Sequence, residues 1–498
     1  MSRKFKVQLF SIILILMILD ACTWIDPLIN RFNGLKSPDQ GKVLEGHPEQ
    51  TQFPQLSPET ELHVTPRSPS SDQRHPQYWL DIELDYEQKT LLVTQVIIYT
   101  NNSGEPLIEI PLIIPPDKYS GAFELLSLQI NAAIAEMDGQ ITDQIMTVPL
   151  FSHLEQGDFV EITLKYQLYL PQQTGAFGYT DRQILLADWY PFVPPLEGEQ
   201  LWLINTPGPV GEYLVYPLSD FNINFCIIKS ESDLIIAASA PVTFFEEGCY
   251  QYEVKNRRNF SLGISPDYHK STATNDVVEI EVFTFPEHAG LAGRAANLAI
   301  QAWETFTDIF GDNQRQHLSI VEAEIDDGLE KDGLFYLSDW YFESADRSPR
   351  NYLTLLIVHE TTHQWFYGWV HNDQAHHPWL DEAVATYSEL LFIEQHHPEL
   401  VDWWWQFRVT DFNPRGYVNS TIYDFRRFRP YVNAVYLRGA LFLQSLREQI
   451  GDQAFFEFLL AYSQIGEEDF IRTTSFFFAL LQQYTNEEMT TLRDEFFR

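Results

Sequence analysis

The chain has 498 residues, of which 45% are hydrophobic and 20% are charged. This length exceeds what a single hydrophobic core usually serves, so we expect two or more globular domains. The formal net charge of −38 argues against nucleic acid as a partner, because phosphate binding needs a basic surface. Solubility is the simplest explanation of this negative charge. A preference for cationic peptides is the alternative, which the net charge alone does not establish.

Residues 1–22 have the pattern of an export signal. A basic start precedes the apolar run 7–19, which is short for a permanent membrane span and typical of a secretory signal. Ala21 and Cys22 follow in a pattern that resembles the bacterial lipobox, in which the cysteine is lipidated and becomes the new N-terminus. The alternative is an uncleaved N-terminal anchor. Both place the protein outside the cytoplasm and attached to a membrane.

Residues 23–77 are rich in Pro, Ser, Gln and Glu and lack a sustained apolar period, which predicts a disordered tether. Alternating apolar and polar residues, broken by turn clusters, predict a largely antiparallel β domain over residues 78–270. Cys226 and Cys249 fall within this domain, each beside a strand-like run. In an exported protein they could form a disulfide, but the sequence fits two unpaired buried thiols nearly as well.

Residues 271–498 are expected to form a second domain of the α+β class with a helical lobe. Apolar residues recur at helical spacing from about residue 290 onwards. The expected helices are 292–310, followed by a C-cap at Gly311, and then 352–370, 379–395, 434–450 and 453–462, with 317–325 as the main strand.

The stretch "LLIVHETTHQWFYGW" contains His359, Glu360 and His363. Two histidines four residues apart lie on one face of a helix, where both imidazoles can bind one zinc ion. Glu360 then lies beside the metal, where a general base for an attacking water is needed. The alternative is a surface helix with two solvated histidines. The apolar flanks argue against it, because they predict burial, which is costly for His and Glu without partners.

Glu382 is the candidate third ligand, since a catalytic zinc usually has three protein ligands and one open position. Eighteen residues separate it from His363, and a turn at Pro378 precedes the helix on which it lies. A helix, a loop and an antiparallel helix could return Glu382 to the metal. Alternatively, it is an ordinary acidic residue in a first helical turn, which the helix dipole favours. Two imidazoles and one carboxylate suit zinc well.

The segments "HETTHQW" and "WLDEAVATYSE", with their eighteen-residue spacer, resemble the gluzincin aminopeptidases, the group of aminopeptidase N and leukotriene hydrolase. Asp381 and Ala383 replace an Asn and a Gly of the family pattern. The resemblance extends from residue 78 to the C-terminus. It implies an N-terminal antiparallel β domain followed by a thermolysin-like, mainly helical catalytic domain. We expect the large C-terminal helical domain of many members to be absent, since the sequence ends at Arg498.

The resemblance also implies roles for individual residues. It implies one Zn²⁺ per chain on the three ligands named above, with Glu360 as the general base. The segment "VNAVYLRGALFLQSL" resembles the family's Tyr-x-Lys-Gly-Ala segment, whose tyrosine stabilises the oxyanion. That role falls on Tyr436, and Tyr431 is the nearby competitor. Arg438 replaces the family's lysine.

Two further acids are candidates. "DGLEKDGLFYL" resembles the family's Gly-x-Met-Glu-Asn segment, and Glu330 takes the position of the glutamate that binds the substrate's free amine. Lys331 replaces the family's Asn and could partly neutralise that anionic site. Glu389, seven residues after Glu382 on the same helical face, resembles an acid that orients a ligand histidine. Its alternative is a solvated helix acid.

The sequence therefore predicts a zinc metallopeptidase that acts on peptides, with an aminopeptidase as the first hypothesis. An endopeptidase on the same scaffold is the first alternative, because of Lys331 and because the family's amine-binding glutamine in the β domain has no clear match. The second alternative is a surface lipoprotein that binds peptides without cleaving them.

Overall fold

The computed structural model describes residues 75–134, 140–197, 201–465, 470–486 and 489–498, which belong to one compact unit, Arg74–Arg498. The expected export signal with Cys22, and the expected tether up to residue 74, lie outside the described residues. Within the described part of the chain, no helix is both long and apolar enough to cross a membrane.

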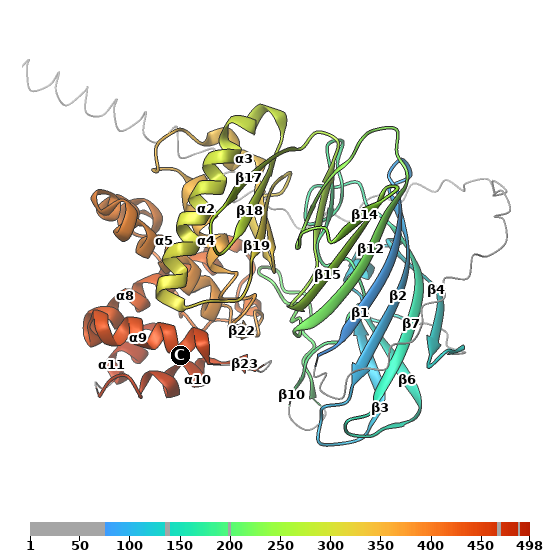
Figure 1. Ribbon diagram of the computed structural model, residues 1–498. Helices are drawn as coiled ribbons and strands as arrows, with labels where there is room; N and C mark the ends of the chain where they lie inside the picture. Colours follow the sequence, from blue (N-terminus) through green and yellow to red (C-terminus); the bar gives the residue numbers. More distant parts are fainter. Residues whose placement is uncertain (1–74, 135–139, 198–200, 466–469, 487–488) are drawn as a thin grey trace, which may run out of the picture. The chain divides into compact units, whose positions relative to one another are not determined.

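An eight-stranded sheet dominates the first half of the described chain (Figure 1). The strand order is β14-β15-β12-β1-β2-β7-β4-β5. Every pair is antiparallel except β1 with β12, so the predicted, largely antiparallel β domain is confirmed. Its strands are β1 (Gln77–Asp85), β2 (Thr90–Thr100), β4 (Phe123–Ile130), β5 (Ala133–Ile134), β7 (Phe159–Tyr169), β12 (Ser219–Lys229), β14 (Phe244–Glu246) and β15 (Cys249–Arg257).

Smaller sheets complete this half of the described chain. A four-stranded sheet has the order β13-β16-β9-β8, and two further sheets pair β3 with β6 and β10 with β11. Buried side chains of the eight-stranded sheet, of β3 and β6 and of the four-stranded sheet form one hydrophobic core. The strands are β3 (Leu107–Ile113), β6 (Ile145–Leu154), β8 (Phe177–Tyr179), β9 (Ile184–Leu186), β10 (Leu196–Glu197), β11 (Leu201–Trp202), β13 (Ile235–Ala238) and β16 (Leu262–Ser265).

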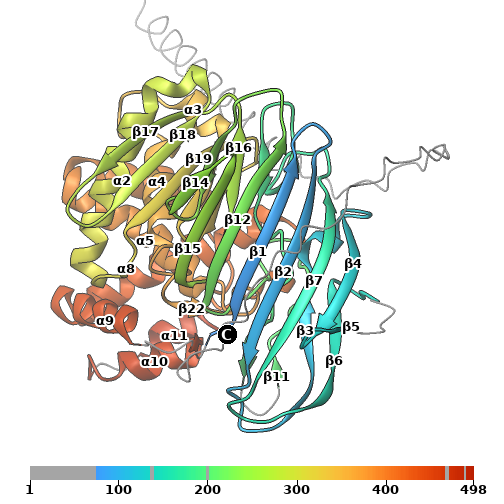
Figure 2. The ribbon, with the colours of Figure 1, turned by 45° about the vertical axis from the view of Figure 1, so that its right-hand side comes forward.

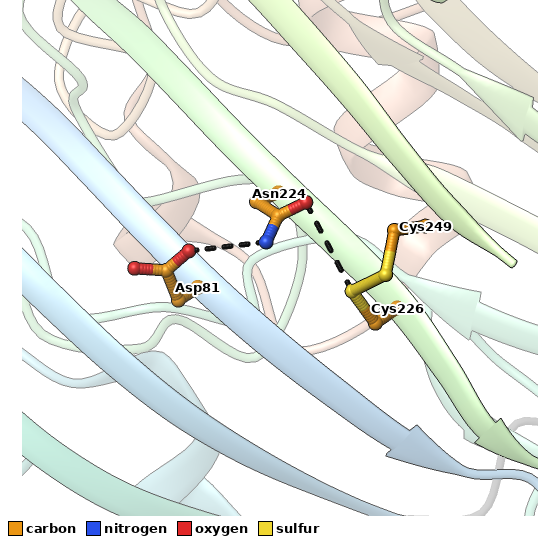
Figure 3. The surroundings of a disulfide bond; sticks show 4 residues. All are labelled: Asp81, Asn224, Cys226 and Cys249. Carbon is orange, nitrogen blue, oxygen red and sulfur yellow. Dashed lines mark hydrogen bonds between the residues drawn. A yellow bond between two sulfur atoms is a disulfide. The ribbon is translucent and has the colours of Figure 1, made fainter. Parts of the chain in front are cut away.

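A disulfide bond joins Cys226 to Cys249 (Figure 3). The two residues face each other across the antiparallel pair of β12 and β15, with their Cα atoms 4.0 Å apart. Of the two states that the sequence left open, the structure therefore has the disulfide. Asn224, on the same strand as Cys226, donates a hydrogen bond to Asp81 of β1 at 3.2 Å and links the disulfide region to the centre of the sheet.

The second half of the described chain begins with a five-stranded mixed sheet of order β17-β18-β19-β21-β20. Helix α2 (Ala289–Phe310) packs beside β17 and β18, as both views of the ribbon show (Figures 1 and 2). The sequence indicated 317–325 as the main strand here and the run 278–286, which corresponds to β18, as strand-like. It missed β21, which is buried at all of its positions and therefore shows no alternation. The strands are β17 (His269–Thr274), β18 (Glu279–Thr284), β19 (His317–Ala323), β20 (Gly328–Lys331) and β21 (Leu334–Ser338), so the expected division at 270/271 falls inside β17.

Helix α4 (Tyr352–Thr362) carries the first part of the histidine motif. The prediction of a helix up to Val370 is wrong, because the chain turns after the motif. Tyr367 has a φ of 136°, outside the helical range, and the amide of Gly368 donates to the carbonyl of His363 at 2.9 Å. Helix α5 (Trp379–His396) follows, within one residue of the prediction.

A long helical run contains the expected tyrosine. It consists of α7 (Phe428–Val432), a π-helical segment at Asn433–Leu437 and α8 (Arg438–Ile450), so the expected helix at 434–450 begins earlier and changes its winding. The remaining elements are helices α3 (Asp339–Ser344), α6 (Val401–Trp404), α9 (Asp452–Gln464), α10 (Thr474–Leu481) and α11 (Thr490–Phe496), with a π segment at Trp405–Val409 and the short strand pair β22 (His371–Asn372) and β23 (Ile471–Arg472).

Candidate metal centre and active site

Helices α4 and α5 bring together the three predicted metal ligands. Glu382, in the first turn of α5, places Oε2 3.3 Å from Nε2 of His359 and 3.5 Å from Nε2 of His363. Neighbouring ligand atoms around a tetrahedral zinc are about 3.4 Å apart, given metal–ligand distances of about 2.1 Å. All three side chains are buried, and their ligand atoms lie within 4.8 Å of one another. The donor set and its spacing therefore fit a zinc ion.

The geometry follows from how the two helices begin and pack. Asn351 caps α4, since its side chain accepts a hydrogen bond from the amide of Thr354 at 2.9 Å. Gly439 of α8 lies so close to α5 that a Cβ there would be 2.2 Å from the Cβ of Ala383, the neighbour of Glu382. This close approach holds the start of α5, and with it the third ligand, against the core.

Each ligand imidazole is oriented by its second nitrogen. Nδ1 of His359 lies 3.0 Å from Oε1 of Glu389, and Nδ1 of His363 lies 2.9 Å from the carbonyl of Phe366. Hydrogen bonds of this kind fix the ring so that the other nitrogen faces the metal. Glu389 thus lies where the sequence placed it.

Glu389 itself is held by two residues that sequence reasoning missed. Arg408 contacts both of its carboxylate oxygens, at 2.8 and 2.9 Å, and the indole of Trp404 donates at 3.1 Å. Burial raises the pKa of Glu389, but the charge of Arg408 outweighs this effect and keeps the pKa below its usual value. In the sequence, the only sign of these partners of Glu389 was an arginine within the aromatic run "WWWQFRV".

Glu360 lies beside the metal ligands with a carboxylate free to act as a base. Its Oε2 has no hydrogen-bond partner among the described residues. The side chain lies against the backbone at Gly328, where a Cβ would be only 2.1 Å from Oε1. Burial raises the pKa of Glu360 to about 7, against the lowering effect of His359 and His363. A carboxylate in this range can both accept and release a proton near neutral pH.

Tyr436, in the π-helical segment, reaches the metal ligands. Its hydroxyl donates to Oε1 of Glu382, and its ring is parallel to that of His359 with centroids 6.0 Å apart. Tyr431 packs edge-on against Tyr436, and a Cβ at Gly211 would lie 3.0 Å from its hydroxyl. Of the two tyrosines, Tyr436 therefore has its hydroxyl at the metal centre. π-Helical turns inside helices are frequent at functional sites.

Glu330, in β20, is buried and belongs to a second group of acids. Nε2 of Gln374 lies 2.9 Å from Oε1 of Glu330 and 2.9 Å from Oε2 of Glu212. Burial raises the pKa of both glutamates, and each is influenced by the other. An oxygen of Glu330 also lies within 4.8 Å of ligand atoms of Glu360 and His363. The acid group therefore adjoins the metal centre.

Lys331 is buried next to these acids. Its Nζ lies 3.0 Å from Oε1 of Glu212 and 3.5 Å from Oδ1 of Asp188. Sequence reasoning missed Glu212, Asp188 and Gln374, because they lie outside the recognised motifs and meet only in the folded chain. The charge of Lys331 is thus shared between acids of the first half of the described chain.

Residues 336–496 match the sequence profile of a family described as the peptidase family M1 domain. The match covers about a third of the chain. The three predicted metal ligands, Glu360 and Tyr436 all lie within the matched residues, whereas Glu330 lies just before them.

Curated relatives resemble part of the chain. Endoplasmic reticulum aminopeptidase 1 of Homo sapiens is 26% identical over 296 residues, which cover 54% of this chain and 32% of the relative. Aminopeptidase N of Lactococcus lactis subsp. lactis is 22% identical over 312 residues, which cover 55% of this chain and 36% of the relative. The chain thus spans about a third of the length of the curated relatives it matches.

Solved structures resemble nearly all of the described chain. The M1 zinc metallopeptidase of Deinococcus radiodurans has a TM-score of 0.58 at 20% identity, covering 85% of this chain and 95% of that one. A mutant of that enzyme bound to a Tyr-Ser-Ala substrate has a TM-score of 0.60 at 19% identity, with coverage of 85% and 95%. This likeness shows a shared fold, a β-sheet part followed by a helical part that contains the M1 domain, and it confirms the predicted fold class.

Proposed function

We propose that this protein is a zinc metallopeptidase that removes residues from the N-terminus of peptides. Support for the peptidase reaction comes from the buried His359, His363 and Glu382 set within an M1 domain. Support for action at the N-terminus comes from one observation above all. The buried Glu330, with the half-buried Glu212 beside it, adjoins the metal centre and is suited to a substrate ammonium group.

In this proposal each catalytic side chain has one task. A bound zinc ion would act as a Lewis acid on the scissile carbonyl. Glu360 accepts a proton from the attacking water and delivers it to the leaving amine. The hydroxyl of Tyr436 donates a hydrogen bond to the carbonyl oxygen as negative charge develops there. Glu389 and Arg408 act at a distance, by fixing the ring of His359.

The acid pair explains why a free amine would be preferred. Two buried carboxylates close to each other disfavour simultaneous ionisation, which is why burial and mutual repulsion raise the pKa of Glu212. A substrate ammonium between them would offset that repulsion and donate hydrogen bonds to both. An acetylated N-terminus has no positive charge and leaves the repulsion in place.

An endopeptidase on the same scaffold remains the second candidate. It is favoured by Lys331, whose ammonium group already pairs with Glu212 and Asp188 and so offsets part of the negative charge. If Lys331 satisfies the acids fully, the site would not need a substrate amine.

The decisive experiment offers one peptide in a free and an N-acetylated form and follows the products by mass spectrometry. We expect stepwise loss of residues from the free form alone. The variant Glu360→Gln, which keeps the shape of the side chain, should retain zinc and lose most activity. Internal cleavage of both forms would replace the aminopeptidase proposal with the endopeptidase. Activity retained in Glu360→Gln would refute the mechanism.

We also propose that the protein acts outside the cytoplasm, attached to a membrane through its N-terminal segment. The disulfide between Cys226 and Cys249 supports this location, because such bonds persist in oxidising compartments. Cell fractionation, followed by mass spectrometry of the N-terminal peptide from the membrane fraction, tests the proposal. A lipid-modified peptide that begins at Cys22 is the expected result, and an unmodified peptide would exclude lipidation of Cys22.

A further inference from the structure

A second cluster of metal-binding side chains lies on the five-stranded sheet, away from the M1 metal centre. Glu279 and Glu281 are two residues apart on β18 and therefore point to the same face of the sheet. His317 begins the neighbouring parallel strand β19, directly opposite Glu279 in the register. One ligand atom from each of the three side chains lies within 4.8 Å of the other two. The strands themselves thus hold three donors around one point.

The spacing in this cluster is compatible with metal ligands. Nε2 of His317 lies 3.5 Å from Oε2 of Glu281. The imidazole–carboxylate contact of His288 with Glu322 is much shorter, at 2.6 Å. The cluster instead matches the M1 centre, where the imidazole–carboxylate distances are 3.3 and 3.5 Å.

The histidine is buried without the partners that it needs. His317 is 4% exposed, and neither ring nitrogen has a hydrogen-bond partner among the described residues. The N–H and the lone pair of a buried imidazole need hydrogen-bond or metal partners, because an unsatisfied buried polar group is costly in free energy.

The charge of the cluster also leaves room for a cation. Lys270 of β17 forms an ion pair with Oε1 of Glu281 and leaves Oε2 of the same carboxylate directed toward His317. Glu279 adds a second negative charge, so one lysine does not neutralise the two carboxylates. One imidazole nitrogen and two carboxylate oxygens form a donor set for a divalent transition-metal ion.

We propose that Glu279, Glu281 and His317 bind a second divalent metal ion, with zinc as the first candidate. The ion would cross-link the beginning of β18 to the beginning of β19. Both strands belong to the five-stranded sheet that also contains β20 with Glu330. The role of the ion is structural, since the cluster shares no residue with the M1 centre. The inference is independent of the proposed peptidase activity.

The test is the metal content of the full chain, measured by mass spectrometry after dialysis against micromolar zinc. We expect about two zinc ions per wild-type chain and about one in His317→Gln, with peptidase activity retained. Glu279→Gln, at a half-buried position, should give the same result if His317→Gln fails to fold. The matched control is His269→Gln, an exposed histidine on the same sheet, which should keep about two ions.

The variant His363→Ala separates this site from the M1 centre. We expect it to keep one zinc ion, which the double variant His363→Ala/His317→Gln should lose. The proposal is overturned if wild-type protein binds a single zinc ion. It is equally overturned if His317→Gln and Glu279→Gln leave the metal content unchanged, or if the second ion binds only at millimolar zinc.

Discussion

The close contact between Glu360 and Gly328 allows a test of how accurately the base must be placed. In Gly328→Ala the new Cβ would be 2.1 Å from Oε1 and 2.8 Å from Cδ of Glu360. Ordinary van der Waals contact begins at 3.4 Å, so either the carboxylate or strand β20 must move by about 1 Å. A displacement of that size at a catalytic group costs about 100-fold in rate, or about 2.7 kcal/mol of activation free energy.

We therefore expect Gly328→Ala to fold and to bind zinc, because the three atoms nearest to the new Cβ all belong to Glu360, but to lose activity about 100-fold in kcat. The measurement is kcat and KM on an aminoacyl p-nitroanilide, with zinc content and Tm determined on the same preparation. The matched control is Gly290→Ala in the first turn of α2, where a Cβ has no atom within 4 Å and should change nothing.

Wild-type kcat in Gly328→Ala, at full zinc content, would refute the reasoning. It would mean either that Glu360 can act from a shifted position or that another group is the base. Loss of zinc together with activity would also count against it, because the contact would then support the metal site as a whole rather than the base alone.

The other predictions concern the groups around this centre. Tyr436→Phe should lower kcat by roughly 100-fold with little change in KM, since its hydroxyl acts on the developing oxyanion. Steady-state kinetics measures both constants, and a raised KM with unchanged kcat would contradict this role. Glu389→Gln should weaken zinc binding about 10- to 100-fold, as read by competition with a chelator, because the ring of His359 loses its anionic partner. Replacing Cys226 and Cys249 with Ala should lower the free energy of unfolding by about 3 kcal/mol in urea titrations, given the sequence separation of 23 residues. An unchanged unfolding midpoint in that double variant would contradict the estimate.

Local spacing allowed the metal centre to be predicted. His359 and His363 are close because they are one helical turn apart, a relation that depends on a few consecutive residues. Glu382 returns because the connecting segment 363–378 leads into a second helix that packs against the first, and the eighteen-residue spacing was the sign of this return. Glu389 was predictable for the same reason, as it shares a helical face with Glu382.

The groups that support the centre were not predictable in this way. Arg408 reaches Glu389 from a π-helical segment whose winding the pattern of apolar residues does not indicate. Glu212 and Gln374 lie in connecting segments 162 residues apart, and only tertiary packing brings them together. The helix up to Val370 was overpredicted because the apolar residues after His363 are buried in a turn, where burial comes from the fold and not from a helical face.

Lys331 shows how the structure changes the meaning of a substitution. From the sequence alone, Lys331 was expected to neutralise part of the negative charge of the neighbouring Glu330. In a β-strand, however, neighbouring side chains start on opposite faces, and the ion pairs of Lys331 are with acids other than Glu330. Lys331 reaches Glu212 and Asp188, while Gln374 bridges the other oxygen of Glu212 to Glu330. The ammonium group of Lys331 thus pairs with Asp188 and Glu212 and forms no ion pair with Glu330, so the site still has a carboxylate to offer a substrate ammonium.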